Sequence, residues 1–135
     1  MKEITVLADN KNLPKVMEFV EGCLEEFDIP TKTKIQLDVA IDEIFSNIAN
    51  YAYKGGQGEA TVIVEIPDDE NYILIEFKDS GKEFNPLEAK DPDITLSAEE
   101  REIGGLGILM VKKSMDNISY EYANGMNILK IKKNY

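Results

Sequence analysis

The sequence TKIQLDVAIDEIFSNIANYAY, residues 33–53, predicts a long helix that carries two different faces. Thr33 and Gln36, three residues apart, have the pattern of a capping box that starts the helix. Apolar residues then recur at the three- and four-residue spacing of an α-helix: Leu37, Ile41, Ile44, Phe45, Ile48 and Ala52. On another side of the same helix lie the polar residues Gln36, Glu43, Asn47 and Asn50. We therefore expect one face to pack on a core and the other to have a different use.

The segments around this helix predict a two-layer fold. We expect strands at residues 3–8, 60–66 and 72–78, helices at residues 12–27 and 105–115, and a terminal hairpin that pairs residues 118–122 with residues 126–132. Asn124-Gly125 within that hairpin is a strong turn signal. The expected fold class is α+β: a two-layer sandwich with helices on one face of a mixed, mostly antiparallel sheet. Residues 1–135 would form a single domain, large enough to bury its own core.

The composition excludes several kinds of function. The chain has 15 Lys and Arg against 26 Asp and Glu, a net charge of −11, and it has no histidine. Nucleophilic catalysis by Ser-His-Asp or Cys-His is therefore excluded, and the lone Cys23 can build neither a disulfide framework nor a thiolate zinc site. The negative charge opposes a phosphate backbone, so we expect no direct nucleic-acid partner. The first residues are too polar for a secretion signal and nothing approaches the ~18 apolar residues of a membrane span, so we expect a cytoplasmic protein without membrane contact.

Glu43 and Asn47 form the first constellation that could carry chemistry. They are one helical turn apart and therefore lie on the same side of the predicted helix. A carboxylate beside a carboxamide oxygen offers a general base and a ligand for Mg²⁺, an ion that prefers oxygen donors and keeps several waters. An exposed polar helix face explains the same two residues when they are taken alone.

The second constellation is FKDSGKEFNP, residues 77–86, in which an apolar strand ends in Asp-x-Gly. A carboxylate at a buried strand end, Asp79, can accept a hydrogen bond from an exocyclic amine such as that of adenine. Gly81 would let a flat ligand approach the backbone. Asp, Ser and Gly are also the usual residues of an ordinary β-turn, which is the alternative interpretation.

The third constellation is GGLG, residues 104–107, directly before a predicted helix. The N–H groups and the dipole at a helix start favour an anion such as phosphate. Only Gly105 and Gly107 match a dinucleotide-binding fingerprint, since Met110 occupies the third glycine position, and the Walker pattern is absent. A flexible hinge or a plain helix start is the alternative.

The three constellations, in this order and at these spacings, resemble the GHKL ATPase superfamily, whose ATP-binding domain has the Bergerat fold. Within that superfamily the chain is similar to the bacterial anti-sigma factor serine/threonine kinases. Residues 42–53 resemble the N box, residues 79–86 the first glycine box and residues 104–116 the second. Each box is weak alone, whereas the ordered set is specific and spans nearly the whole chain.

The resemblance implies ATP and Mg²⁺ as ligands and assigns a role to each constellation. Glu43 would be the general base, Asn47 the Mg²⁺ ligand, and Asp79 the group that binds the adenine amine, with Gly81 giving the base its room. The remaining implied ATP contacts are Asn50, Gly104, Gly105, Leu106 and Gly107. Residues 85–102 would form a lid over ATP, in which Arg101 could reach the phosphates or could equally be a solvated arginine.

The sequence departs from the family pattern in two places. Residues 126–133 contain no Thr, although some family members carry one there near the adenine, so base recognition would depend more on Asp79 and water. Ile103 stands where other members have an Arg directly before the second glycine box. The absence of histidine also excludes the self-phosphorylation on His that histidine-kinase relatives perform.

The resemblance implies a serine/threonine protein kinase that transfers the γ-phosphoryl group of ATP to a small antagonist protein of the STAS type. A sigma factor and a second copy of the chain are the further partners that it implies. One alternative is a regulatory binding module that ATP gates without any transfer, and another is a simple ATPase in which Glu43 orients water. All three use the same residues, and the presence of Glu43 favours catalysis, because a pure binding module does not need a base.

Overall fold

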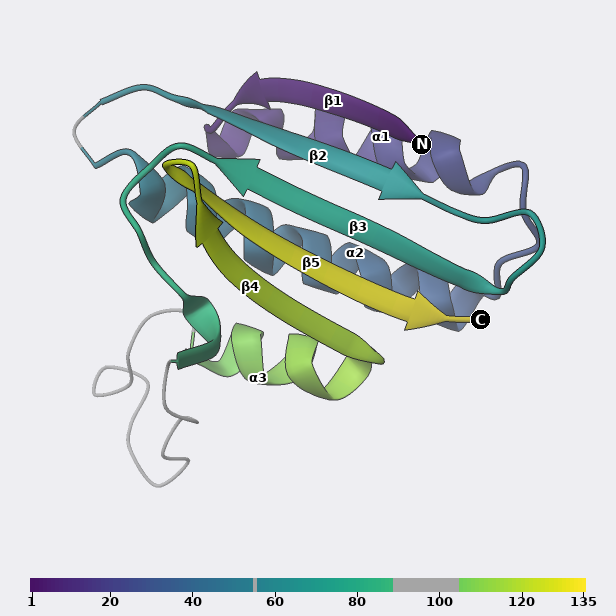
Figure 1. Cartoon of the computed structure of the whole chain (residues 1–135). Coiled ribbons are helices and arrows are strands. Elements are labelled where there is room, and N and C mark those ends of the chain that lie inside the picture. The colour runs from purple at the N-terminus through teal and green to yellow at the C-terminus, as the bar shows by residue number, and fades with distance from the viewer. Residues whose placement is uncertain (55, 89–104) are drawn as a thin grey trace.

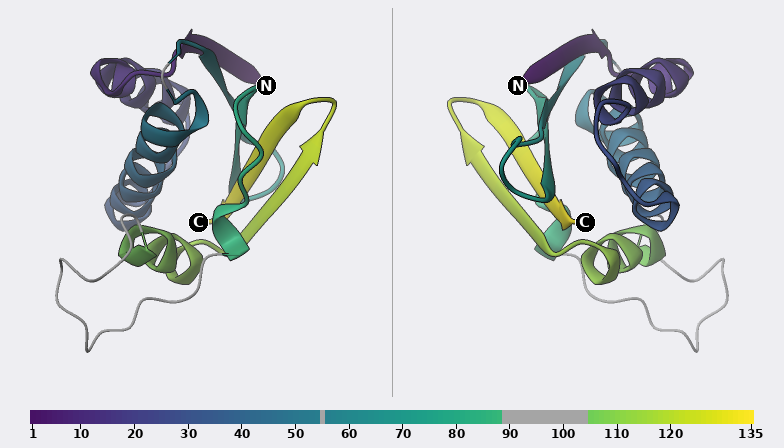
Figure 2. Two further views of the ribbon diagram at one scale, coloured as in Figure 1. Left: turned by 90° about the vertical axis from the view of Figure 1, so that its left-hand side faces the viewer. Right: turned by 90° about the vertical axis from the view of Figure 1, so that its right-hand side faces the viewer.

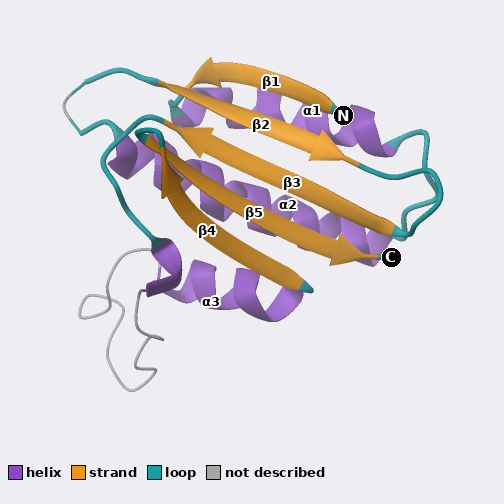
Figure 3. Cartoon of the chain, in the orientation of Figure 1, coloured by secondary structure: helices purple, strands orange, loops and turns teal. Residues whose placement is uncertain are grey.

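In the part of the chain that the structure describes, five strands form one sheet, in the order β1-β2-β3-β5-β4 (Figures 1 and 3). The computed structural model describes residues 1–54, 56–88 and 105–135. The strands are β1 (Lys2–Leu7), β2 (Glu59–Glu65), β3 (Tyr72–Asp79), β4 (Asn117–Ala123) and β5 (Met126–Asn134). We expected a mixed sheet, but all four pairings of these strands are antiparallel. The physical reason is that β3 and β4 run in the same direction but are not neighbours. The strand between them, β5, runs in the opposite direction.

The described residues include three α-helices, which lie on one face of the sheet, as the two views of Figure 2 show. They are α1 (Leu13–Leu24), α2 (Thr31–Asn47) and α3 (Gly105–Ser114). This arrangement confirms the expected α+β class with two layers. Within the ranges that the structure describes, no helix combines the length and the apolar composition that crossing a bilayer requires.

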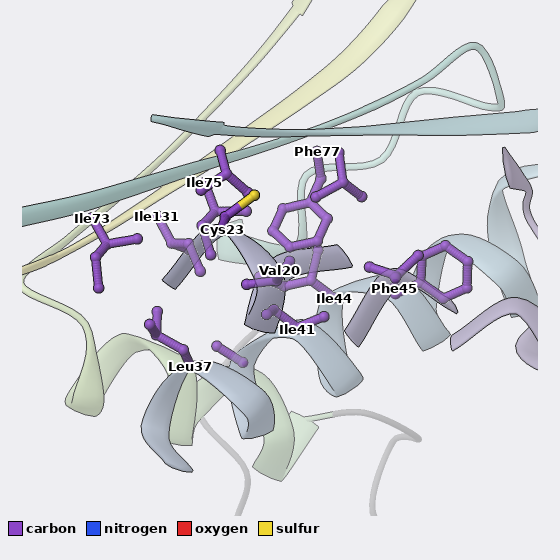
Figure 4. Packing of buried hydrophobic residues seen from close by; sticks show 14 of the residues in the cluster. Val20, Cys23, Leu37, Ile41, Ile44, Phe45, Ile73, Ile75, Phe77 and Ile131 are labelled. Carbon is purple, nitrogen blue, oxygen red and sulfur yellow. The ribbon is translucent and has the colours of Figure 1, made fainter. Parts of the chain in front are cut away.

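The core lies between the two layers and follows the period of each element. Alternate residues of β3 and β5, including Ile73, Ile75 and Ile131, are buried against the helices. Leu37 and Ile41 of α2 meet them from the other layer (Figure 4). Full burial of such a side chain contributes about 1.5–3 kcal/mol, so this alternation fixes which face of each strand turns inward.

The beginning of α2 differs from the expected capping box. The helix starts at Thr31, and Pro30 takes the N-cap position without a side-chain hydrogen bond. The carbonyl oxygen of Pro30 accepts a hydrogen bond from the Lys34 N–H at 3.1 Å. Thr33 lies inside the first turn and is buried, so its side chain is part of the packing and does not cap the helix.

The end of α2 also differs, because the α-helix does not run to Tyr53. After Asn47 the chain widens into a π-helical turn, Ile48–Ala52. The N–H of Ile48 still bonds the carbonyl oxygens of Ile44 and Phe45, four and three residues earlier, so the wider winding begins after this bond. Such π-turns are frequent at functional sites.

The terminal hairpin forms as the sequence predicted. Asn124 and Gly125 both have positive φ angles, 55° and 76°. A two-residue turn with two positive φ angles matches the twist of the strands that it joins, and only glycine and small polar residues adopt it at low cost. The turn fixes the β4–β5 register, in which Tyr120 lies opposite Leu129.

Candidate functional site

The three constellations of the sequence meet at one end of the sandwich. In Figure 1 the end of α2, the end of β3 and the β4–β5 turn all lie on the left side. A Cβ atom added to Gly107, in the first turn of α3, would lie 2.1 Å from the carboxylate carbon of Glu43. The absence of a side chain at Gly107 therefore lets α3 approach the α2 carboxylate directly.

Glu43 and Asn47 are joined by a hydrogen bond on α2. The Asn47 Nδ2 donates to Oε1 of Glu43 at 3.2 Å. Because the amide nitrogen is turned toward the carboxylate, the Asn47 Oδ1 is the atom left to accept a cation or another donor. The predicted pair is therefore present as one polar unit.

Burial changes the acid–base behaviour of Glu43. Desolvation raises the pKa of its carboxyl group, the nearby negative charge of Asp42 raises it further, and the hydrogen bond from Asn47 opposes both effects. A carboxylate with a raised pKa is a better proton acceptor near neutral pH than an exposed glutamate. This is the environment that a general base requires.

Asp79 is the last residue of β3 and occupies an inward position of that strand, with only 5% of its surface exposed. Its Oδ1 accepts hydrogen bonds from the Gly81 N–H and from the Asn127 Nδ2, both at 2.9 Å. Among the residues that the structure describes, no hydrogen bond reaches its Oδ2. Asp79 therefore presents a buried carboxylate oxygen that a ligand can use.

A cavity connects Asp79 with Asn47. Besides these two residues its polar lining consists of Tyr51, Lys82, Tyr120 and Asn127. The other lining residues are Ile44, Ile48, Ala52, Phe77, Phe84, Pro86, Ile108 and Leu129. Apolar walls with a few convergent polar groups are typical of a small-molecule site, and a buried carboxylate suits a flat base with an exocyclic amine. Glu43 does not line this cavity, but it is hydrogen-bonded to Asn47, which does.

Gly81 has a structural task of its own in this site. A Cβ atom at this position would lie 2.3 Å from the carbonyl oxygen of Ala52, in the π-helical turn. The same oxygen accepts a hydrogen bond from the Lys82 N–H at 2.9 Å. The glycine therefore lets the loop after β3 pack on the end of α2, and its expected role as room for a ligand stays a prediction.

Asn127 is a site residue that the sequence analysis missed. It lies opposite Asp79 in the β3–β5 register and is only 6% exposed. The signal was present in the sequence, because Asn127, Leu129 and Ile131 alternate along β5 and all turn inward. A polar residue at an inward position of a buried strand needs hydrogen-bond partners, and it therefore marks a site.

Tyr53 is a second residue that the sequence analysis did not single out. Its hydroxyl donates to the carbonyl oxygen of Glu59 and accepts from the Ser80 N–H, both at 2.7 Å. A Cβ atom on Gly58 would lie 2.2 Å from the Tyr53 ring. Tyr53 thus ties the π-helical turn to the ends of β2 and β3, next to Asp79.

The remaining predicted residues are not gathered at the cavity by the described structure. Asn50 does not line it, and its Oδ1 accepts a hydrogen bond from the Asn10 Nδ2 at 2.9 Å. Gly105 starts α3 and Leu106 follows in the same helix, as the expected helix start requires. Gly104, Arg101 and residues 89–102 of the expected lid lie outside the described residues. Residues 86–88 form a 3-10 turn, of which Pro86 lines the cavity.

The donor atoms fit a magnesium-bound nucleotide. In the described parts of the chain no group of three His, Cys, Asp or Glu side chains gathers into a metal cluster. Mg²⁺ commonly binds through one or two protein oxygens, waters and the phosphates of a substrate. Asn47 Oδ1 is an oxygen of this kind, beside the Glu43 carboxylate at the side of the cavity where α3 begins. Asp79 lies at the cavity wall, and its expected role in binding the adenine stays a prediction.

Residues 6–133 match the model of the histidine kinase-like ATPase domain, which is of the GHKL type, and the chain belongs to that family.

Curated relatives carry a more specific name. The chain is 31% identical over 98 residues to a protein of Bacillus cereus named serine-protein kinase RsbW, and 31% identical over 100 residues to a Bacillus mycoides protein of the same name. These matches cover 71% of this chain and 61% of each relative. The chain thus spans less than two thirds of the relatives that it matches.

Solved structures agree on the fold. The histidine kinase domain of the Erythrobacter litoralis EL346 blue-light activated histidine kinase matches with a TM-score of 0.58 and 11% identity, over 93% of this chain and 60% of that one. The Acinetobacter baumannii histidine kinase AdeS matches with a TM-score of 0.52 and 14% identity, over 99% of this chain and 68% of that one. At these identities the likeness concerns the architecture alone.

Proposed function

We propose that this chain is an ATP-dependent serine/threonine protein kinase of the anti-sigma factor type. Its substrate is a Ser or Thr on a small antagonist protein of the STAS type, and its setting is the cytoplasm. A sigma factor is the second partner, which the kinase sequesters. The names of the relatives from Bacillus cereus and Bacillus mycoides support the kinase class.

One observation supports the proposal: the carboxylate of Glu43 on α2 lies beside a cavity whose wall also contains the buried carboxylate of Asp79. Asn47 and Asp79 line the same cavity, and Asn47 is hydrogen-bonded to Glu43. A nucleotide whose base reaches Asp79 would extend its phosphates toward Asn47 and the start of α3. The γ-phosphate would then lie near Glu43.

The chemistry assigns one task to each group. Glu43 would take the proton of the acceptor hydroxyl. The hydroxyl oxygen would attack the γ-phosphorus of ATP, and the bond between the γ-phosphorus and the ADP oxygen would break. Asn47 would supply its Oδ1 to the cation. Bound Mg²⁺ supplies the positive charge that neutralises the phosphoryl oxygens. Because the chain carries a net charge of −11, which repels ATP, we expect its nucleotide binding to depend strictly on Mg²⁺.

The test is a transfer assay with γ-labelled ATP, Mg²⁺ and the small proteins encoded beside this chain, read by mass spectrometry. Phosphoserine or phosphothreonine on one of those proteins supports the kinase. Free phosphate without a labelled protein indicates an ATPase instead, and tight ATP binding without turnover indicates an ATP-gated module. A reaction without Mg²⁺ and a reaction with Glu43→Gln are the two controls: the first should give no label, and the second should give label at a rate roughly 10²- to 10⁴-fold lower.

A further inference from the structure

Asn127 makes four hydrogen bonds inside the site. Its Nδ2 donates to Oδ1 of Asp79 and to the carbonyl oxygen of Lys82, both at 2.9 Å. Its Oδ1 accepts from the Phe84 N–H at 3.1 Å and from the hydroxyl of Tyr120. The whole capacity of its carboxamide is therefore used by the protein, and none is left for a ligand.

The partners allow only one orientation of this carboxamide. A carboxylate such as Asp79 and a carbonyl oxygen such as that of Lys82 can only accept, so both must face the amide nitrogen. The backbone N–H of Phe84 can only donate, so it must face the amide oxygen. Turning the group over would break three of these hydrogen bonds, at a cost of about 0.5–1.5 kcal/mol for each.

This fixed carboxamide determines how Asp79 meets a ligand. Oδ1 of Asp79 is held by Asn127 and by the Gly81 N–H, so the carboxylate cannot rotate freely. Its Oδ2, which nothing in the described residues occupies, becomes the oxygen available in the cavity. An ionised carboxylate only accepts, and it therefore binds a donor and repels an acceptor at that place.

We propose that Asn127 is the positioning residue that makes this cavity selective for a 6-amino purine over a 6-oxo purine. It acts through Asp79, whose carboxylate it keeps in one orientation. It also joins Asp79 to the backbone of residues 82–84, so the adenine end of the cavity and the loop after β3 are fixed by the same side chain. This inference rests on the proposed function in that the ligand is a purine nucleotide.

The experiment compares ATP with inosine triphosphate, which carries a carbonyl oxygen in place of the amine. Dissociation constants of both, with Mg²⁺, are measured by calorimetry for the wild type and for Asn127→Asp. The wild type should bind ATP at least about tenfold more tightly than inosine triphosphate, because inosine triphosphate lacks the amine that donates to the charged carboxylate of Asp79. In Asn127→Asp two carboxylates would face each other at the distance of a hydrogen bond, so they repel unless they share one proton, and Asp79 is no longer held with its Oδ2 toward the ligand. The dissociation constant of inosine triphosphate divided by that of ATP should therefore fall about tenfold or more in this variant.

Two further variants separate positioning from general damage. Asn134→Asp makes the same chemical change at an exposed position of the same strand, and its ratio should equal that of the wild type. Tyr120→Phe removes one donor to the Asn127 oxygen and should lower the ratio by about twofold to tenfold. Circular dichroism establishes that each variant is folded.

The outcomes decide the proposal as follows. If folded Asn127→Asp binds both nucleotides more weakly but keeps the wild-type ratio, Asn127 has a structural role only and the proposal is wrong. If that variant does not fold, an unchanged ratio in Tyr120→Phe overturns the proposal instead. A wild type that binds neither nucleotide removes the proposed function together with this inference, and it is recognised before any variant is made.

Discussion

The carboxylate of Glu43 fills the space in front of Gly107, where a Cβ atom would lie 2.1 Å from its carboxylate carbon. The two residues are 64 positions apart in the sequence, and the contact brings the carboxylate of α2 to the N-terminal turn of α3. An α-helix start is also where a phosphate binds most readily. The relationship therefore connects the proposed base with the proposed phosphate position.

Glu43→Gln should retain ATP binding and lose phosphotransfer. The amide keeps an oxygen that accepts the Asn47 hydrogen bond, but it cannot take a proton from the acceptor hydroxyl. We expect the transfer rate to fall by roughly 10²- to 10⁴-fold, the usual contribution of a general base. Single-turnover kinetics with labelled ATP measures it. Asp42→Asn removes the neighbouring exposed carboxylate and is the matched control, and an unchanged rate in Glu43→Gln would reject the catalytic role.

Asn47→Ala should abolish the magnesium-dependent part of ATP affinity. The substitution removes the Oδ1 that would bind the cation, while the adenine end of the cavity is left intact. Calorimetry with Mg²⁺ and with EDTA should then give similar, weak binding, whereas the wild type should bind much more tightly with Mg²⁺. Ser46→Ala, whose hydroxyl bonds Asp42 on the same helix, should behave as the wild type. Wild-type affinity in Asn47→Ala would contradict the metal assignment.

Gly107→Ala should damage function far more than stability. The new methyl group collides with the end of a flexible side chain, so Glu43 can rotate away at little cost. Alanine also favours a helix by about 0.8–1 kcal/mol over glycine, so the free energy of unfolding should change by less than about 1 kcal/mol. The displaced base should lower the transfer rate by about 10- to 100-fold. A normal rate in the folded variant would show that the position of Glu43 in this structure is not the productive one.

Gly81→Ala and Gly22→Ala should change stability in opposite directions. At position 81 the methyl group would meet the Ala52 backbone at 2.3 Å, and the backbone can yield only by moving the π-helical turn, so we expect a loss of about 1–3 kcal/mol. At position 22, inside α1, no atom lies within 4 Å, so the helix preference of alanine should stabilise by about 0.8–1 kcal/mol. Urea denaturation of both variants measures the difference. If Gly81→Ala and Gly22→Ala were equally stable, the loop after β3 would not depend on the close approach of Gly81 to the Ala52 backbone.

The stability of the protein should carry a pH signature of Glu43. Its pKa is higher in the folded state than its ordinary value of 4.5, so the folded protein binds this proton more tightly than the unfolded chain does. The contribution of Glu43 to the free energy of unfolding therefore falls as pH rises from 4.5 through the folded pKa, and it stays low above that. Glu43→Gln removes this loss, so it should be more stable than the wild type at about pH 8 and should lose that advantage toward acid pH. A stability difference that is independent of pH would show that Glu43 is not desolvated.

The local patterns of the sequence predicted most of the fold. The density of β-branched and aromatic residues at positions 72–78 predicted β3, the hairpin pattern predicted β5 at residues 126–132, and Asn124-Gly125 predicted the turn that the positive φ angles confirm. The helix boundaries were less certain, because propensity and capping patterns compete with packing. Thr33 was expected to cap α2 and is instead buried, and the last turn of the expected helix widens after Asn47 to meet Gly81.

The sequence by itself determined the pairing of Glu43 with Asn47, because four residues are one turn of a helix and the contact needs nothing from the rest of the chain. Only the tertiary structure decided that Asp79 meets Asn127, since the two are 48 residues apart and are joined by the register of β3 on β5. It likewise decided that Asn50 turns to Asn10 and that Gly107 receives Glu43. Spacing along one helix is fixed by backbone geometry, whereas contacts between elements depend on how the whole core packs.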